Sequence, residues 1–291
     1  MPLGIARSVL TTTAVVSGGD GADRGYWKSN GSVASGSSGA GVIVDFGADW
    51  SFVGDSTVSV WFKGSTSDMD ANANFGAARN NDHMALQHYM NKGTSIYNLN
   101  AYTKCHPSGA DNFVQANSAV PDFDSNFLND EWHNITASIR SSTTSAIAQI
   151  YLDGTQYDNA TTTIVATSAS NVKRYFHIQQ GSNNVPGSVY QNDPDGAHTL
   201  AVANYFYDDK FYDLTSNIGK FYDSGVPAMG TDGTGTGLTQ PKIYLYANVA
   251  GEMVDASGSL TNGGTATDGS VYGVREGSGD VVVYTSGGPG A

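Results

Sequence analysis

Short segments in which apolar and polar residues alternate recur along most of this 291-residue chain. A period of two residues is typical of half-buried strands, because successive side chains point to opposite faces of a sheet. Runs rich in Gly, Ser, Asn and Asp separate the segments and favour turns. The pattern predicts strands at residues 42–46, 58–63, 75–78, 83–89, 95–102, 134–139, 148–152, 172–178, 200–207 and 241–246. We therefore expect an all-β fold.

The alternation also predicts which side chains share a face. In residues 200–207 it places Tyr205 and Tyr207 on one face, and Val202 and Phe206 on the other. His133 falls in phase with Ile135 and Ala137, which predicts a buried, hydrogen-bonded histidine in the core.

The clearest pair of adjacent strands lies within residues 132–154. The polar run 141–145 is too small to pack and is expected to turn the chain between them. Asp153-Gly154 predicts a tight turn after the second strand, because Gly tolerates positive φ and Asp can hydrogen-bond its own backbone.

Five residues of this hairpin form a recognisable pattern: Trp132, His133, Tyr151, Asp153 and Gly154. A Trp-His strand followed by a strand ending Tyr-x-Asp-Gly resembles the laminin G-like, concanavalin A-like superfamily. The run at residues 56–64, STVSVWFKG, resembles an early strand of the same superfamily. The resemblance implies an antiparallel two-sheet jelly-roll sandwich, in which the five residues are a fold signature. It implies little about function, since one fold supports many functions.

One short helix is predicted after residue 212. Asp213 or Thr215 can cap it by accepting the first free backbone N–H groups, and Gly225 is placed to end it. A core-facing stripe follows the helical period at Leu214, Ile218, Phe221 and Tyr222.

The composition divides the chain into three parts. Residues 1–41 form an arm and loop that belong to the sandwich or serve for docking, and residues 42–249 form the jelly roll. Residues 250–291 form an extension rich in Gly, Ser and Thr, with a predicted hairpin of Val271–Arg275 and Val281–Tyr284. We expect the arm and the Gly-rich tail to dock on partner subunits.

The charge pattern argues against two classes of partner. The net charge is −13 and the 14 Lys and Arg residues are scattered, so no basic patch is available to bind nucleic acid or an anionic membrane surface. No segment approaches the roughly 20 apolar residues of a membrane span. The single cysteine, Cys105, excludes an internal disulfide.

A second resemblance lies in residues 206–246, FYDDKFYDLTSNIGKFYDSGVPAMGTDGTGTGLTQPKIYLY. The segment is similar to one found in laminin G-like virion proteins of tailed bacteriophages. The matching residues are Tyr212-Asp213-Leu214, Lys220-Phe221, Asp223, Gly225, Pro227, Gly230, Asp232-Gly233, Pro241 and Ile243-Tyr244-Leu245. With the hairpin, the two resemblances cover residues 42–246. They imply a virion component: a head decoration, a fibre or a tail-associated protein.

Catalytic patterns are not found in the sequence. A retaining glycosidase needs two carboxyl groups about 5–5.5 Å apart, yet Glu131, Glu252 and Glu276 are isolated from one another. Asp130 is adjacent to Glu131 and so points elsewhere. No cofactor is expected.

The best candidate for a metal site is the loop Asn192-Asp193-Pro194-Asp195-Gly196. Oxygen ligands at Asp193 and Asp195, before a glycine, suit Ca²⁺. The same residues also form an ordinary turn, so both interpretations stay open.

We therefore expect a non-enzymatic virion structural protein that forms homo-oligomers and docks on capsid or tail proteins. The alternative is a lectin-like module that binds host surface glycans, and the third hypothesis is a glycosidase. One group of tyrosines either packs in the interior and at subunit interfaces or forms a sugar platform: Tyr205, Tyr207, Tyr212, Tyr244 and Tyr246.

Overall fold

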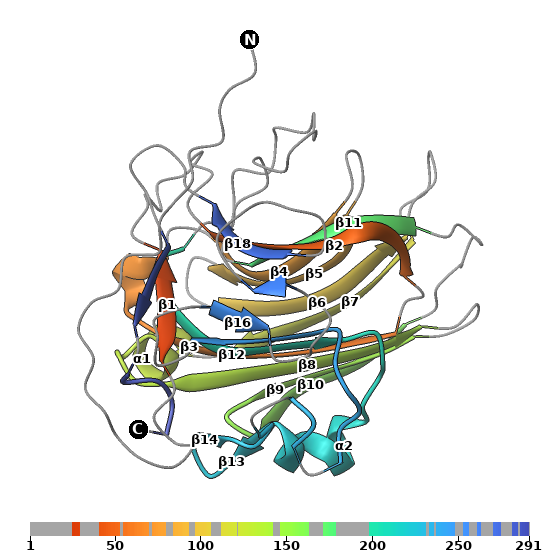
Figure 1. The fold of residues 1–291 in the computed structure, drawn as a ribbon. Coiled ribbons are helices and arrows are strands. Elements are labelled where there is room, and N and C mark those ends of the chain that lie inside the picture. The colour runs from red at the N-terminus through yellow and green to blue at the C-terminus, as the bar shows by residue number, and fades with distance from the viewer. Residues whose placement is uncertain are drawn as a thin grey trace.

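The chain folds into two β-sheets that lie face to face (Figure 1). The computed structural model describes residues 25–29, 41–52, 55–69, 72–79, 84–92, 97–105, 112–120, 122–141, 146–162, 171–178, 198–230, 233–235, 237–247, 253–255, 261–262, 270–274, 281–284 and 286–290. The statements below concern these residues.

The first sheet has nine strands. Seven follow one another across it: β10 (Thr155–Thr162), β9 (Ala146–Leu152), β8 (His133–Ser141), β3 (Ser56–Lys63), β12 (Ala201–Asp208), β1 (Tyr26–Ser29) and β19 (Val281–Tyr284). Two more are added beside the second half of β12, namely β15 (Ile243–Ala247) and β16 (Met253–Asp255). All its pairs are antiparallel.

The second sheet has eight strands. Their order is β17 (Thr261–Asn262), β18 (Ser270–Val274), β2 (Gly41–Phe52), β11 (Asn171–Ile178), β4 (Asn72–Arg79), β5 (Met84–Lys92), β6 (Tyr97–Cys105) and β7 (Asn112–Val120). Only the β17–β18 pair among these is parallel. The short helices η1 (Thr66–Asp68) and α1 (Phe123–Phe127) follow β3 and β7. The predicted all-β, antiparallel two-sheet sandwich is confirmed.

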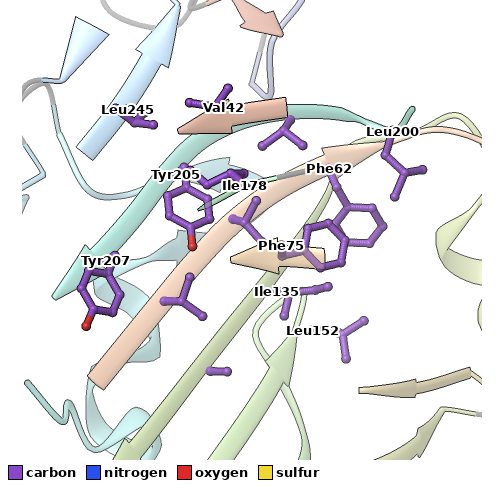
Figure 2. Close-up of a cluster of buried hydrophobic side chains, with 14 of the residues drawn as sticks. Val42, Phe62, Phe75, Ile135, Leu152, Ile178, Leu200, Tyr205, Tyr207 and Leu245 are labelled. Atoms are coloured by element: carbon purple, nitrogen blue, oxygen red, sulfur yellow. The ribbon is translucent and has the colours of Figure 1, made fainter. Parts of the chain in front are cut away.

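The inner core fills the space between the sheets. The second sheet contributes Val42, Val44, Phe75 and Ile178, all buried. The first sheet contributes alternate residues of its central strands, including Phe62, whose ring lies 5.4 Å from that of Phe75 (Figure 2). Each such side chain contributes about 1.5–3 kcal/mol on burial, so this core holds the two layers together.

A bulge in β12 changes one predicted face. Asn204 has φ +46°, and the register with β3 shifts between Ala203 and Phe206. A bulge of one residue reverses the alternation beyond it. Val202 therefore lies in the inner core with Tyr205 and Tyr207, whereas Phe206 points outward. The prediction that Val202 shares a face with Phe206 was wrong for this reason.

Much of the outer face of the first sheet is also buried. The described part of residues 209–241, which we call the cover segment, crosses it with α2 (Leu214–Asn217), η2 (Ile218–Lys220), β13 (Tyr222–Asp223) and β14 (Val226–Pro227). These elements lie outside both sheets in Figure 1. A second hydrophobic cluster forms between sheet and cover. Its buried members are Trp61, Tyr151, Ala203, Phe206, Leu214, Phe221, Met229, Leu238 and Tyr244.

Polar side chains of the sheet bond directly to the backbone of the cover segment. Thr57 Oγ1 donates to the Lys210 carbonyl at 2.7 Å, and the Tyr212 N–H donates to Ser138 Oγ at 3.1 Å. The Leu214 N–H donates to Gln149 Oε1 at 2.8 Å. These polar positions alternate with the inner core along β3, β8 and β9, yet they are buried.

The predicted helix is present but shorter than expected. Asp213 caps it, its side chain accepting from the Thr215 N–H, as predicted. After α2 and η2 the chain turns into the β13–β14 hairpin, with Ser224 at φ +52° and Gly225 at φ +91°. Successive positive φ values are typical of a tight hairpin turn, so Gly225 serves that turn instead of ending a helix.

Strands from both ends of the chain are built into the sheets. The predicted terminal hairpin is wrong, because β18 pairs with β2 in the second sheet while β19 pairs with β1 in the first. Residues 286–290 pack on the chain itself: Gly287 accepts a hydrogen bond from Trp132, and Gly290 lies against Val226. The division at residues 42 and 249 stays a prediction.

The cover segment offers a matched pair of glycines for a stability test. Gly233 has φ +83°, and a Cβ there would meet Pro241 Cγ at 2.8 Å and Tyr244 Cγ at 2.9 Å. We expect Gly233→Ala to lower the free energy of unfolding by about 2–4 kcal/mol, through backbone strain and steric overlap. Urea denaturation measures this change.

Gly219 is the control, because a Cβ at this helical position meets nothing within 4 Å. Gly219→Ala is expected to be neutral or stabilising by up to about 1 kcal/mol. Equal losses in both variants would contradict the described packing of the cover.

Candidate functional site

The turn at Asp153-Gly154 organises one end of the first sheet. Asp153 has φ +46° and Gly154 φ +74°. The Asp153 carboxylate lies 2.6 Å from His133 Nδ1 and accepts from the Asn134 N–H at 2.8 Å. A Cβ on Gly154 would lie 2.9 Å from the Tyr222 ring, so the cover segment packs directly on this turn.

His133 is part of the structural framework. Its Nε2 lies 3.1 Å from Asn129 Oδ1, and its ring packs near Phe62 and Phe127 at centroid distances of 5.9 and 5.1 Å. Only 9% of the residue is exposed. The prediction of a hydrogen-bonded core histidine is confirmed, and the ring is unsuited to reach a ligand.

Trp132 lies at the surface beside two tyrosines. Its indole Nε1 donates to the Gly287 carbonyl at 2.9 Å. The Tyr26 ring meets the Trp132 ring edge to face at 5.5 Å and stacks on the Tyr284 ring at 4.5 Å. All three residues are half-buried. We call Tyr26, Trp132 and Tyr284 the aromatic ledge.

The β1–β19 pair fixes the position of the ledge. Tyr26 pairs with Tyr284, and the neighbouring pair, Trp27 and Val283, points into the inner core. The ledge therefore lies on the outer face of the first sheet, next to the second hydrophobic cluster.

Two lysines follow the ledge along the same face. One row of paired residues crosses β3, β12, β1 and β19. In it Lys63 pairs with Ala201, Ala201 pairs with Lys28, and Lys28 pairs with Val282. Lys28 Nζ lies 3.0 Å from Asp68 Oδ1.

Asp68 is held by four donor groups from three residues. Its carboxylate accepts from the backbone and side chain of Ser65, from Thr199 and from Lys28. Burial opposes its ionisation, but these bonds outweigh burial and lower the pKa of the carboxyl below its usual value. The bonds fix Lys28 in place and leave Asp68 little capacity for a ligand.

A second carboxylate, Asp208, ties down the cover segment. It accepts from the Tyr212 hydroxyl at 2.9 Å and from Thr239 Oγ1 at 3.2 Å, and so bonds near both ends of the cover. Burial raises the pKa of its carboxyl. The residue is 2% exposed, which closes it to ligands.

The remaining candidate carboxylates lie either outside the described residues or at the surface. Asp193 and Asp195, with the rest of the calcium loop, lie outside the described residues, as do Glu252 and Glu276. Glu131 is exposed. Among the residues that the structure describes, no group of three or more His, Cys, Asp or Glu could hold a metal ion.

Three of the five tyrosines proposed for a sugar platform are buried, while Tyr212 and Tyr246 are half-buried. Tyr205, Tyr207 and Tyr244 are buried, and Tyr151, of the fold signature, lies under the cover segment with its hydroxyl donating to Gln156 at 3.0 Å. The sequence interpretation missed Tyr26 and Tyr284. The pattern Tyr-Trp-Lys-Ser at 26–29 could have indicated an outward Tyr and Lys, but not the partner strand.

Of the comparisons with known proteins, only the one with solved structures found similar chains. No family model and no curated protein matches the chain. A heptameric pentraxin from Limulus polyphemus matches at 8% identity and a TM-score of 0.48, over 86% of this chain and 94% of that one. A putative carbohydrate-binding protein from Bacteroides ovatus matches at 12% identity and 0.49, over 91% of this chain and 61% of that one.

Domains LG4-5 of the mouse laminin α1 chain also match, at 9% identity and a TM-score of 0.40, over 69% of this chain and 46% of that one. At identities of 8–12% and TM-scores of 0.40–0.49, these likenesses carry no conclusion about function. Among the described residues no helix is long and apolar enough to cross a membrane.

The signature turn allows a direct test of its role. Asp153→Ala removes the acceptor for His133 and the Asn134 N–H, and leaves buried donors unpaired. We expect it to lower the free energy of unfolding by about 2–4 kcal/mol more than Asp130→Ala. Asp130 is a matched control, because it too has positive φ, at 64°, but it is exposed. Equal losses in denaturant titrations would show that the carboxylate bonds of Asp153 add nothing.

Proposed function

We propose that this protein is a non-catalytic, lectin-like module that binds glycans on the aromatic ledge. The observation that carries the proposal is the group of half-exposed rings formed by Tyr26, Trp132 and Tyr284. Tyr and Trp offer an apolar body with a polar tip. Such side chains can cover the C–H face of a sugar ring while their polar atoms meet hydroxyl groups.

The ledge is already ordered before a ligand arrives. Trp132 is fixed by its bond to Gly287, and Tyr26 and Tyr284 hold each other by stacking. Binding to fixed side chains avoids the entropy loss of immobilising them, which is about 0.5–1.5 kcal/mol for each rotamer-rich side chain. A rigid aromatic surface therefore favours recognition of weakly binding ligands.

The carboxylates near the ledge support a role without catalysis. Asp153 bonds His133 and the Asn134 backbone, and Asp68 bonds Lys28, Ser65 and Thr199. A glycosidase needs carboxyl groups that face the scissile bond. Both groups instead hold the fold.

Tyr284→Ala tests the site. We expect binding on a glycan array, and at least a tenfold loss of affinity in the variant, which equals about 1.4 kcal/mol. Tyr246→Ala is the control, because Tyr246 is a half-buried tyrosine of the same sheet that packs beside Tyr244. Thermal melting checks that both variants fold. A wild-type protein that binds no glycan, with or without calcium, would refute the function.

A second proposal is that the protein is a virion structural component, located in the particle and homo-oligomeric. The resemblance of residues 206–246 to bacteriophage laminin G-like proteins favours it. In the fold this segment contains the cover. Glycan binding and a virion location are compatible, because a surface subunit can attach a particle to its host.

Mass spectrometry of purified particles from the source that carries this sequence tests the location. We expect peptides of the chain at a fixed ratio to the major capsid protein, since a structural subunit has a defined copy number. Absence of the chain from particles would contradict the virion proposal and would leave glycan binding unaffected.

A further inference from the structure

The row of side chains next to the ledge indicates the class of glycan. Resting on the glycan-binding function above, we propose that the ligand is an acidic glycan, in which a carboxylate on the sugar stacked at the ledge binds Lys63. Register, charge and exposure each contribute to this assignment.

Strand register places Lys63 beside the ledge. Phe62 of β3 pairs with His133 of β8 in antiparallel register. One residue further along β3, Lys63 therefore lies opposite Trp132, which precedes β8. On its other side Lys63 pairs with Ala201 of β12. Strands lie about 4.8 Å apart, so the Lys63 stem is one strand spacing from the Trp132 backbone.

The two lysines of the row differ in their pairing. Lys28 is neutralised by Asp68 at 3.0 Å, and Asp68 is itself saturated by Ser65 and Thr199. Lys63 is half-buried, and the ion pairs formed within the described part of the chain do not include it. Lys63 therefore offers three N–H donors and a full positive charge.

Ala201 and Ala203 are small, buried residues between the larger side chains of this face. Ala201 separates Lys63 from Lys28, and Ala203 lies in β12 between Trp61 and the β1 strand. Methyl groups at these positions allow the long lysine stem to bend toward the rings. The lysine ammonium is a compact point charge on a flexible stem, so it can reach a carboxylate without a fixed geometry.

The net negative charge of the protein makes the Lys63 cation at the ledge a selective site for anionic ligands. The net charge is −13, so an anionic ligand is repelled over most of the surface. A negatively charged sugar therefore gains the most binding free energy where Lys63 lies beside the preformed aromatic ledge. A neutral sugar would gain from the rings but would leave the Lys63 charge unused.

Galacturonan oligosaccharides and their methyl-esterified forms are suitable probes, because esterification removes the carboxylate charge and adds only a methyl group. By titration calorimetry at low salt, we expect the free acid to bind at least tenfold more tightly than the ester. Lys63→Met should abolish that preference while it retains the aliphatic stem. Tyr284→Ala should weaken binding of both forms.

Lys242→Met is the charge-matched control, because Lys242 is exposed and pairs with Asp209 at 3.3 Å away from the ledge. It should keep the preference for the acid. Rising salt should reduce the preference, since screening weakens exposed charge pairs.

Equal affinity for acid and ester, or a preference that survives Lys63→Met, would overturn the acidic assignment while leaving the ledge as a glycan site. Failure of both oligosaccharides to bind would also overturn it. In that case the glycan-binding function stands only if the array shows a neutral ligand whose binding depends on Tyr284.

Discussion

The burial of the first sheet on both faces is the constraint on which the rest of the structure depends. One face packs on the second sheet, and the other lies under the cover segment. Leu214, Phe221, Met229 and Leu238 of the cover are buried against the sheet. At about 1.5–3 kcal/mol each they contribute on the order of 6–12 kcal/mol, comparable with the whole stability of a domain. The cover is therefore a fixed part of the fold and cannot act as a lid, which leaves the ledge end of that face for ligands.

The alternation of residues predicted the inner core well, because its apolar residues recur at every second position of the strands. Ile135, Ala137 and Ile139 lie where the pattern placed them. The intervening Thr136 and Ser138 look solvent-facing in the sequence, yet they are buried, because the cover lies over them. The bulge at Asn204 could not be predicted either, since a positive φ at a non-glycine residue leaves no pattern in the sequence.

The functional surface was the least predictable part. Trp132 was recognised only as a fold signature, and its neighbours Tyr26 and Tyr284 stand near opposite ends of the chain. No local pattern can pair strands that are so distant in sequence, and so β1 and β19 could not be joined in advance. The predicted hairpin of β18 and β19 failed for the same reason.

The segment that resembles bacteriophage proteins is explained largely by packing. Leu214 and Phe221 fill the second cluster, Gly233 fits against Pro241 and Tyr244, and Tyr244 donates to the Gly230 carbonyl. Because these matching residues serve in packing, the resemblance indicates a similar way of covering a sheet. It carries no chemistry of its own, so the glycan hypothesis has to rest on the ledge and on Lys63.

Hydrogen–deuterium exchange with and without a bound acidic oligosaccharide tests the location of the site most directly. The ledge model predicts slower exchange in peptides that contain residues 25–29, 129–133 and 281–290, and unchanged exchange in residues 209–241. Protection confined to residues 181–198, around the predicted calcium loop, or to the cover segment would contradict it.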